Sequence, residues 1–555
     1  MYVQQYAPVL GSLAWSSLVA ALPLLVLFVL LGGLRVRAWL ASIIALVVSL
    51  LVAVLVYAMP VGQAVLAGTE GAVFGFFPIL WIVINALWIY RMTVRTGHFD
   101  VLRRSFSSVS DDQRVQAIII AFAFGALLEA LAGFGAPVAI CTVMLMAVDF
   151  KPLKAAVVAL VANTAPVAFG AIAVPITTLA QVTGLSEDVL GAVVGRQTPV
   201  LAVFVPFVLV ALVDGMRGLR ETWGVALVGG LVFAVAQFLT SNFLSVPLTD
   251  IVASLLCAGA VVLTVRARRT SQDRVPVAAG GGVVPDGPGP DAGSGAAPER
   301  DTTRDTTRDS ARDTVLAYLP YVIIIALFSI QQIPPVKKAL DATTAKFRWP
   351  GLDVRTPTGS QVSSTSFTFN WLASAGSILL IAGLITMLVL RVAPRTAVSS
   401  YGQTLTELRT AIVTVMAVLA LAYVMNLSGQ TITIGQWLAA TGGFFAILSP
   451  VLGWLGVAVT GSDTSSNSLF GALQVAAAQR SGLDPVLLAA ANTSGGVLGK
   501  MISPQNLAIA ASAVGMAGRE GEIFRRVLPW SVLFLVGMAA LVYLQSTPVL
   551  GWMLP

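Results

Sequence analysis

The chain has 555 residues, of which 57% are hydrophobic and 11% charged, against about 25% charged residues in a soluble globular protein. This composition excludes a soluble protein and leaves room for roughly a dozen membrane-spanning helices of about 20 residues each. The formal net charge of +7 lies mainly in loops, where it indicates membrane topology, and no basic aromatic motif suggests a nucleic-acid partner.

The N-terminal region predicts three membrane-spanning helices, in the charge-free runs 16–34, 38–69 and 71–90. Glu70 falls between the last two runs and is expected at the exterior surface. No basic start or small-residue cleavage site precedes the first run, so we expect it to remain as a helix. Arginines follow the first and third runs on one side, which the positive-inside rule makes cytoplasmic and the N-terminus extracytoplasmic. These arginines are Arg35, Arg37, Arg91, Arg95, Arg103, Arg104 and Arg114.

Residues 115–150 leave the cytoplasmic side and return to it, yet they are too few for two complete spans. Glycines and a proline in the segment 132–137 break helical hydrogen bonding in the middle of this apolar run. Backbone that is broken at membrane depth must line a cavity. We therefore predict a re-entrant hairpin near 115–150, followed by a broken helix near 154–181 with a polar break at Asn163-Thr164-Ala165-Pro166.

Spans near 199–215, 223–241 and 249–265 complete a first membrane domain, residues 1–265. Residues 266–313 are then rich in proline, glycine, aspartate and arginine and cannot form an apolar core. The sequence predicts a disordered cytoplasmic linker there. A regulatory or partner-binding segment is the alternative interpretation of the same composition.

The second membrane domain, residues 314–555, contains a second Gly- and Ser-rich break and ends with an extracytoplasmic C-terminus. Its predicted elements are spans near 315–332, 371–391, 410–428 and 528–546, a hairpin near 450–480 and a broken helix near 485–515. Residues 431–448 are interpreted as an interfacial helix. The charge-free stretch from Thr410 to Ser462 is also long enough for two crossings.

The two halves follow the same order of spans, hairpin and broken helix, but the first begins outside and the second inside. This order indicates an inverted-topology repeat. The helix after each hairpin carries a similar polar break, Asn163-Thr164 in the first half and Asn492-Thr493-Ser494-Gly495-Gly496 in the second. The predicted fold is therefore an all-α polytopic membrane protein with about 12 transmembrane helices and two re-entrant hairpins.

Three charged residues lie deep within apolar sequence: Glu129, Asp463 and Lys500. Glu129 has 14 uncharged residues before it and 19 after, and Lys500 has 15 before it and 18 after. Intramembrane charges of this kind are candidate functional residues. An anionic substrate is expected at Lys500 and at the N–H groups of the broken helix ends. Predicted substrate-binding residues besides Lys500 are Gly133, Gly135, Asn163, Thr164, Ser462, Thr464, Ser465, Ser466, Asn467, Asn492, Thr493 and Ser494.

Glu129 or Asp463 is predicted to load and release a proton, because burial raises the proton affinity of a carboxylate. This predicts symport. For Lys500, a structural ion pair with Asp463 or Glu129 competes with direct substrate contact, although the two roles are compatible. For Glu129, a helix-packing hydrogen bond is the structural alternative. Sodium coupling remains open, since unwound backbone and Asp463 also suit a cation.

Two other functional classes fit the sequence less well. A passive anion channel needs neither a buried carboxylate nor paired helix breaks. A membrane enzyme is disfavoured because the sequence offers no nucleophile with a histidine base, no metal-ligand cluster and no phosphate loop. The lone histidine, His98, is expected to be a solvated loop residue, and Cys141 and Cys257 are expected to be buried hydrophobic residues. We predict no cofactor and no metal.

Four motifs together resemble the bacterial L-lactate permease family: residues 129–140 (EALAGFGAPVAI), 163–170 (NTAPVAFG), 460–467 (TGSDTSSN) and 495–505 (GGVLGKMISPQ). The likeness covers nearly the whole chain except the predicted linker, which departs from the family pattern. It implies proton-coupled import of L-lactate, D-lactate and glycolate across the bacterial plasma membrane. It also implies a fold of the ion transporter superfamily, contact with membrane lipid and no enzyme activity. A homo-oligomer is compatible with the sequence.

Overall fold

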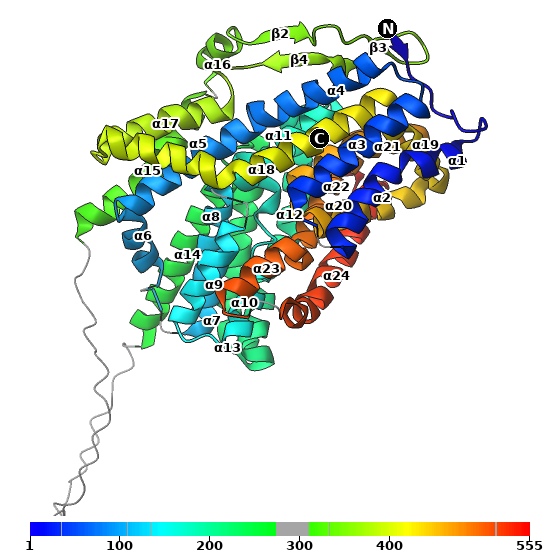
Figure 1. Cartoon of the computed structure of the whole chain (residues 1–555). Helices are drawn as coiled ribbons and strands as arrows, with labels where there is room; N and C mark the ends of the chain where they lie inside the picture. The colour runs from blue at the N-terminus through cyan, green and yellow to red at the C-terminus, as the bar shows by residue number, and fades with distance from the viewer. Residues whose placement is uncertain are drawn as a thin grey trace, which may run out of the picture.

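The computed structural model shows a bundle of helices with a small β-structure at one end (Figure 1). It describes residues 1–555 except for 35, 108, 111, 132, 134, 273–309, 332, 517 and 518. Among the described residues, ten helices are long and apolar enough to cross a membrane, or 11 if one bent pair counts as a span. This confirms the predicted all-α polytopic class. The two counts differ because α12 and α13 are counted together, α17 and α22 are too short to be counted, and the segments Gln113–Leu131 and Gln430–Thr460, which contain hairpin arms, are included.

The helices and strands follow one another in four groups, with η marking short 3₁₀- or π-helical turns. The N-terminal group is β1 (Tyr2–Val3), α1 (Leu13–Ala20), α2 (Leu22–Phe28), η1 (Val29–Gly33), α3 (Ala38–Leu55), α4 (Val61–Phe74), η2 (Gly75–Leu80), α5 (Trp81–Arg95) and α6 (His98–Ser107). The second group is α7 (Gln113–Gln116), η3 (Ala117–Phe124), α8 (Gly125–Leu131), α9 (Ala136–Ala147), α10 (Pro152–Ala162), η4 (Val167–Phe169), α11 (Gly170–Thr183), α12 (Glu187–Ala202), α13 (Val205–Phe243) and α14 (Thr249–Gln272). The third group is α15 (Ala311–Gln331), α16 (Pro334–Asp341), β2 (Ala345–Arg348), β3 (Val354–Arg355), η5 (Ser363–Thr365), β4 (Ser366–Phe369), α17 (Ala375–Val389) and α18 (Pro394–Ser428). The last group is α19 (Gln430–Leu438), η6 (Ala439–Phe444), α20 (Phe445–Thr460), α21 (Asp463–Ser481), α22 (Pro485–Gly499), η7 (Lys500–Ile502), α23 (Pro504–Ala513), α24 (Glu520–Gln545) and η8 (Gly551–Met553).

The predicted linker, 266–313, lies mostly outside the described residues. Of its ends, residues 266–272 continue α14, and α15 begins at Ala311. Ser310 caps this helix, since its hydroxyl oxygen accepts the Asp313 backbone N–H at 3.1 Å.

The predicted position of the turn between the second and third spans was wrong, and so was the predicted exterior position of Glu70. The chain turns at residues 56–60, where Pro60 precedes α4, and α4 then runs through Glu70. Glu70 is 1% exposed in the interior of that helix. Gly71 is a packing residue, because a Cβ there would stand 2.5 Å from the Leu419 carbonyl of α18. A charge and a glycine therefore mark a tight helix contact and not a turn.

The first hairpin forms as predicted from η3 and α8 on one arm and α9 on the other. The Gln113 side-chain amide donates to the carbonyls of Val148 and Asp149 at 3.2 and 3.0 Å, which brings the two open ends together. Cys141 is buried in this contact and donates from its thiol to the Ile120 carbonyl at 3.3 Å. Both cysteines are free and buried, in agreement with their predicted role.

The second hairpin consists of α20 and α21, joined at Gly461. Across its arms, the Ser466 hydroxyl donates to the Gly453 carbonyl and the Gln474 amide to the Ser449 carbonyl, both at 3.1 Å. Gly461 has a φ of +75°, a left-handed conformation that favours glycine and reverses the chain here.

The two broken helices differ from each other in where the break lies. The first breaks as predicted, and α10 and the segment Val167–Thr183 meet at 65°. The second does not break at 492–496, which lie inside α22. The chain leaves the helix only at η7, because Pro504 begins α23 and cannot continue the hydrogen-bonding pattern of α22.

The two hairpin units pack against each other reciprocally. The second hairpin arm of each unit contacts the second part of the other unit's broken helix, in the pairs α9–α23 and α21–α11. The first part of each broken helix contacts the helix that follows the other broken helix, in the pairs α10–α24 and α22–α12. Such exchange of equivalent contacts is the packing expected of two units related by a two-fold axis. It supports the inverted repeat.

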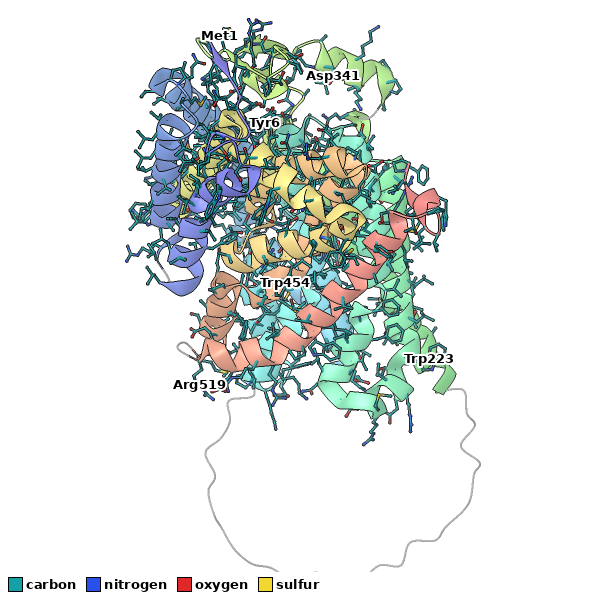
Figure 2. All side chains as sticks on the ribbon, turned by 90° about the vertical axis from the view of Figure 1, so that its right-hand side faces the viewer. Met1, Tyr6, Trp223, Asp341, Trp454 and Arg519 are labelled. Atoms are coloured by element: carbon teal, nitrogen blue, oxygen red, sulfur yellow. The ribbon has the colours of Figure 1, made fainter. Side chains whose placement is uncertain are left out.

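Helices that precede the first hairpin and helices that precede the second hairpin form a second layer beside these units. Figure 1 shows α3, α4 and α5 lying along α17 and α18, and the contacts pair α3 and α4 with α18 and α5 with α17. At one end, β2 and β4 form an antiparallel pair and β1 runs parallel to β3. Figure 2 places Met1, Tyr6 and Asp341 toward this end, opposite Trp223 and Arg519.

Candidate functional site

Two of the three isolated charges form an ion pair in the centre of the bundle. Lys500 donates from Nζ to Glu129 Oε1 at 2.5 Å, and their side chains are 8% and 4% exposed. Asn163, from the first break, donates from its amide nitrogen to Glu129 Oε2 at 3.0 Å. Each carboxylate oxygen of Glu129 thus has one donor, and the pair joins residues 371 positions apart.

The second break positions Lys500. Lys500 begins the short turn η7, which is closed by a hydrogen bond from the Ser503 backbone N–H to the Lys500 carbonyl. The same carbonyl also accepts hydrogen bonds from the Ser503 hydroxyl at 3.0 Å and the Asn506 amide at 3.2 Å. These bonds fix the backbone from which the lysine side chain extends to Glu129.

The first break brings strained backbone against Glu129. Ala171, Ile172 and Ala173 all have left-handed φ angles, between +45° and +58°. Residues other than glycine cost about 1–2 kcal/mol each in this conformation, and such strain concentrates at binding sites. Gly170 leaves room for the carboxylate, because a Cβ there would stand 2.9 Å from Glu129 Oε1.

Asp463 lies on the second hairpin, at the first position of α21. It is buried at 3% exposure, and neither carboxylate oxygen has a hydrogen-bond partner among the residues that the structure describes. The carboxylate rests on α22, where a Cβ on Gly496 would stand 2.2 Å from Oδ1. The charge of Lys500 also acts on this carboxylate.

A cavity of about 1180 Å³ connects these charges. Its wall includes both hairpin tips, the first break and the second break. The cavity residues among the predicted site are Glu129, Gly133, Ser462, Asp463, Thr464, Ser465 and Lys500. It extends to Arg37, one of the arginines used to predict the cytoplasmic side, and to Trp39, Glu520 and Phe524. The cavity therefore reaches the end of the bundle that is predicted to be cytoplasmic.

The remaining predicted substrate residues lie outside the cavity wall, and four of them, Ser466, Asn467, Asn492 and Thr493, hold helices together. Asn467 donates from its amide to the Thr493 hydroxyl at 2.7 Å and to the Pro175 carbonyl at 3.0 Å. Asn492 donates to Asn467 Oδ1 at 2.9 Å and to the Ser466 hydroxyl at 3.5 Å. These bonds join the second hairpin to α22 and α11.

Three further residues of the prediction have other positions. Ser494 donates from its hydroxyl to Gln197 Oε1 at 2.7 Å, and Thr164 donates to the Val161 carbonyl at 2.7 Å. Gly135 lies against α23, where a Cβ would stand 2.3 Å from Ile509 Cδ1. A direct substrate role for these residues stays a prediction.

His98 is half-buried at the start of α6 and not fully solvated, so burial lowers the pKa of its imidazole while the charge of Asp313 raises it. Its Nδ1 lies 2.8 Å from the Thr96 hydroxyl.

Several cavity residues were missed from the sequence. Thr410 and Thr414 of α18 line the cavity one helical turn apart, and Gln505 reaches the second hairpin tip. A Cβ on Gly461 would stand 2.6 Å from Gln505 Oε1. The sequence could have predicted this pair, since residues four positions apart on a helix share a face and the rest of that face is mostly apolar.

Comparisons with known proteins bear on the family. The model of the L-lactate permease family matches residues 16–549. The L-lactate permease of Escherichia coli K12 is 41% identical over all of both chains, and that of Bacillus subtilis is 38% identical over all of both chains. The glycolate permease of Escherichia coli K12 is 40% identical over 98% of each chain. The structure of the Alcanivorax borkumensis YdaH transporter gives a TM-score of 0.44 at 16% identity, with 88% of each chain covered. The chain therefore belongs to the L-lactate permease family, whose members are membrane permeases.

Proposed function

We propose that this protein imports L-lactate, and also D-lactate and glycolate, by proton symport across the bacterial plasma membrane. The observation that carries the proposal is the Lys500–Glu129 ion pair on the wall of the cavity. Family membership supports the substrate class, since relatives are named as L-lactate and glycolate permeases. Both anions are small 2-hydroxy carboxylates.

The ion pair offers a direct route to coupling. A substrate carboxylate and the Glu129 carboxylate compete for the same lysine ammonium. When Glu129 binds a proton, it no longer neutralises Lys500, which then binds the substrate. Proton and substrate therefore load together.

The same exchange keeps the site electrically neutral. The empty site holds one positive lysine and one negative glutamate, whereas the loaded site holds a lysine, a substrate anion and a neutral glutamic acid. An unpaired charge is costly within the bilayer. Movement between the two sides is thus favoured only for the empty or the fully loaded site.

The second hairpin tip provides groups for the rest of the substrate. Ser462, Thr464 and Ser465 line the cavity at the N-terminus of α21, where the partial positive charge of the helix end favours an anion. Their hydroxyls suit the 2-hydroxyl group of the substrate. The Asp463 carboxylate rests against α22. Because Asp463 also lines the cavity, it is the second candidate for the proton-carrying residue.

Uptake of radiolabelled L-lactate into proteoliposomes of the purified protein tests the proposal. One arm imposes an inward proton gradient, a second imposes an inward sodium gradient at equal pH, and protein-free liposomes serve as the control. Uphill uptake driven by the proton gradient alone is expected. Uptake that requires sodium would reassign the coupling ion, and no uptake in either arm would overturn the substrate.

A further inference from the structure

A second buried carboxyl, Asp250, lies outside the cavity described above. It stands in the first turn of α14 and is 0% exposed. Gln237 of α13 donates from Nε2 to Asp250 Oδ1 at 2.9 Å. The other oxygen, Oδ2, has no hydrogen-bond partner in the part of the chain that the structure describes.

Helix capping does not account for this carboxyl. A capping acid accepts a backbone N–H of the first turn, but Oδ2 accepts none and Oδ1 accepts a side-chain amide. An ionised carboxylate with one neutral donor is costly to bury. Asp250 is therefore expected to hold a proton on Oδ2 in this conformation.

Asp250 is joined to the first break through Gln237. The same Gln237 amide donates to the Ala165 carbonyl at 3.3 Å, and the Thr198 hydroxyl donates to Gln237 Oε1 at 3.3 Å, which fixes the amide orientation. Two residues earlier in the break, Asn163 donates to Glu129. The break residues Asn163 and Ala165 thus contact Glu129 on one side and the Asp250 cluster on the other.

The two carboxyls also lie on helices in contact, because α14 packs against α8, which carries Glu129. α14 further packs against α13, η3, α11 and α15. Of the titratable groups on these elements within the described chain, Glu129 is the one whose charge acts on Asp250. Cys257, on α14 itself, donates its thiol to the Gly229 carbonyl at 3.3 Å and takes no part in the cluster.

We propose that Asp250 is a second proton-carrying residue, which passes its proton to Glu129 when the substrate loads; this inference rests on the proposed symport. The proton leaves Asp250 Oδ2 and joins the Glu129 carboxylate, so Glu129 becomes neutral and releases Lys500. Asp250 becomes an anion with the Gln237 amide as its one donor, and because this buried charge is costly, Asp250 takes up a new proton from outside.

Asp250→Asn tests this role, because the amide oxygen still accepts from Gln237 while the transferable carboxyl proton is lost. We expect proton-driven uphill uptake in proteoliposomes to fall about 100-fold, the lower range for a positioned proton-transfer group. Exchange of labelled for unlabelled lactate at equal pH should persist. Asp341→Asn, an exposed acid in α16, is the matched control and should leave both activities unchanged.

Each result decides the role. Undiminished uphill uptake by the Asp250→Asn protein would overturn it, as would equal loss of exchange and uphill uptake in a folded protein. If the wild type exchanges lactate but ignores the proton gradient, the proposed coupling fails and this inference fails with it. If Asp250→Asn does not fold, Gln237→Met provides the second test: loss of uphill uptake with retained exchange supports the role, and unchanged uphill uptake contradicts it.

Discussion

The two hairpin units share a plan of packing but place their charges differently. In the first unit, Glu129 precedes the hairpin tip and the break contributes a neutral amide, Asn163. In the second unit, Asp463 follows the tip and the break itself carries Lys500. Glu129 pairs with Lys500 across the two units. The repeat therefore supplies a symmetric framework for one asymmetric site and not two equivalent sites.

The units also differ in how their breaks are held. At the second break, the Lys500 carbonyl accepts hydrogen bonds from the Ser503 hydroxyl and the Asn506 amide. The first break instead contains three left-handed residues beside Gly170. Because bonded amides resist movement and strained backbone is readily released, we expect the first break to be the more mobile of the two.

The largest effect is expected for Lys500→Ala, which removes the only positive charge among the three isolated charged residues, Glu129, Asp463 and Lys500. Truncating one member of a buried charge pair costs about 2–5 kcal/mol, so lactate uptake should fall by about two orders of magnitude or more. Uptake per folded protein in proteoliposomes measures this, with the exposed Lys338→Ala as the control. Normal uptake by the Lys500→Ala protein would show that Lys500 does not bind the substrate.

Glu129→Gln should separate binding from coupling. The amide leaves Lys500 free, so lactate exchange at equal pH is retained, while accumulation against a gradient falls to the equilibrium value. The measurement compares steady-state accumulation with exchange in the same vesicles. An accumulation that still follows the proton gradient would transfer the coupling role to Asp463 or to another residue.

Substitution of one glycine in each unit tests how tightly the two buried carboxylates are packed. Gly496→Ala brings a Cβ to 2.2 Å from Asp463, whereas Gly170→Ala brings one to 2.9 Å from Glu129. Overpacking costs about 1–3 kcal/mol, so each should lower uptake, by about tenfold for Gly496→Ala and less for Gly170→Ala. Initial uptake rates of folded protein test the order. The reverse order would show that the first unit is the more sensitive to crowding.

The smallest effect is expected in the chain between the two domains. Replacement of residues 275–308 by a Gly-Ser segment of the same length keeps the reach between α14 and α15 and spares the cap at Ser310. Uptake should be unchanged, because the natural composition there predicts no packed structure. A folded but inactive replacement would show that these residues take part in transport.

Much of the framework was predictable because its signals are local. Glycine and proline in an apolar run indicated the first hairpin, a Gly- and Ser-rich segment indicated the second, and the first break fell where Asn163 and Pro166 indicated it. The second break did not coincide with Asn492. There a continuous helix accommodates the polar residues through Asn467, a partner that local sequence does not reveal.

The sequence by itself determined the membrane class, the family and the three isolated charges, since hydropathy, glycine breaks and uncharged flanks depend only on neighbouring residues. Tertiary structure alone decided that Lys500 pairs with Glu129, that Glu70 and Asp250 are buried, and which predicted residues face the cavity. These outcomes depend on helices far apart in sequence meeting at fixed distances. A charge near the end of an apolar run has the same local pattern whether it faces water or a neighbouring helix.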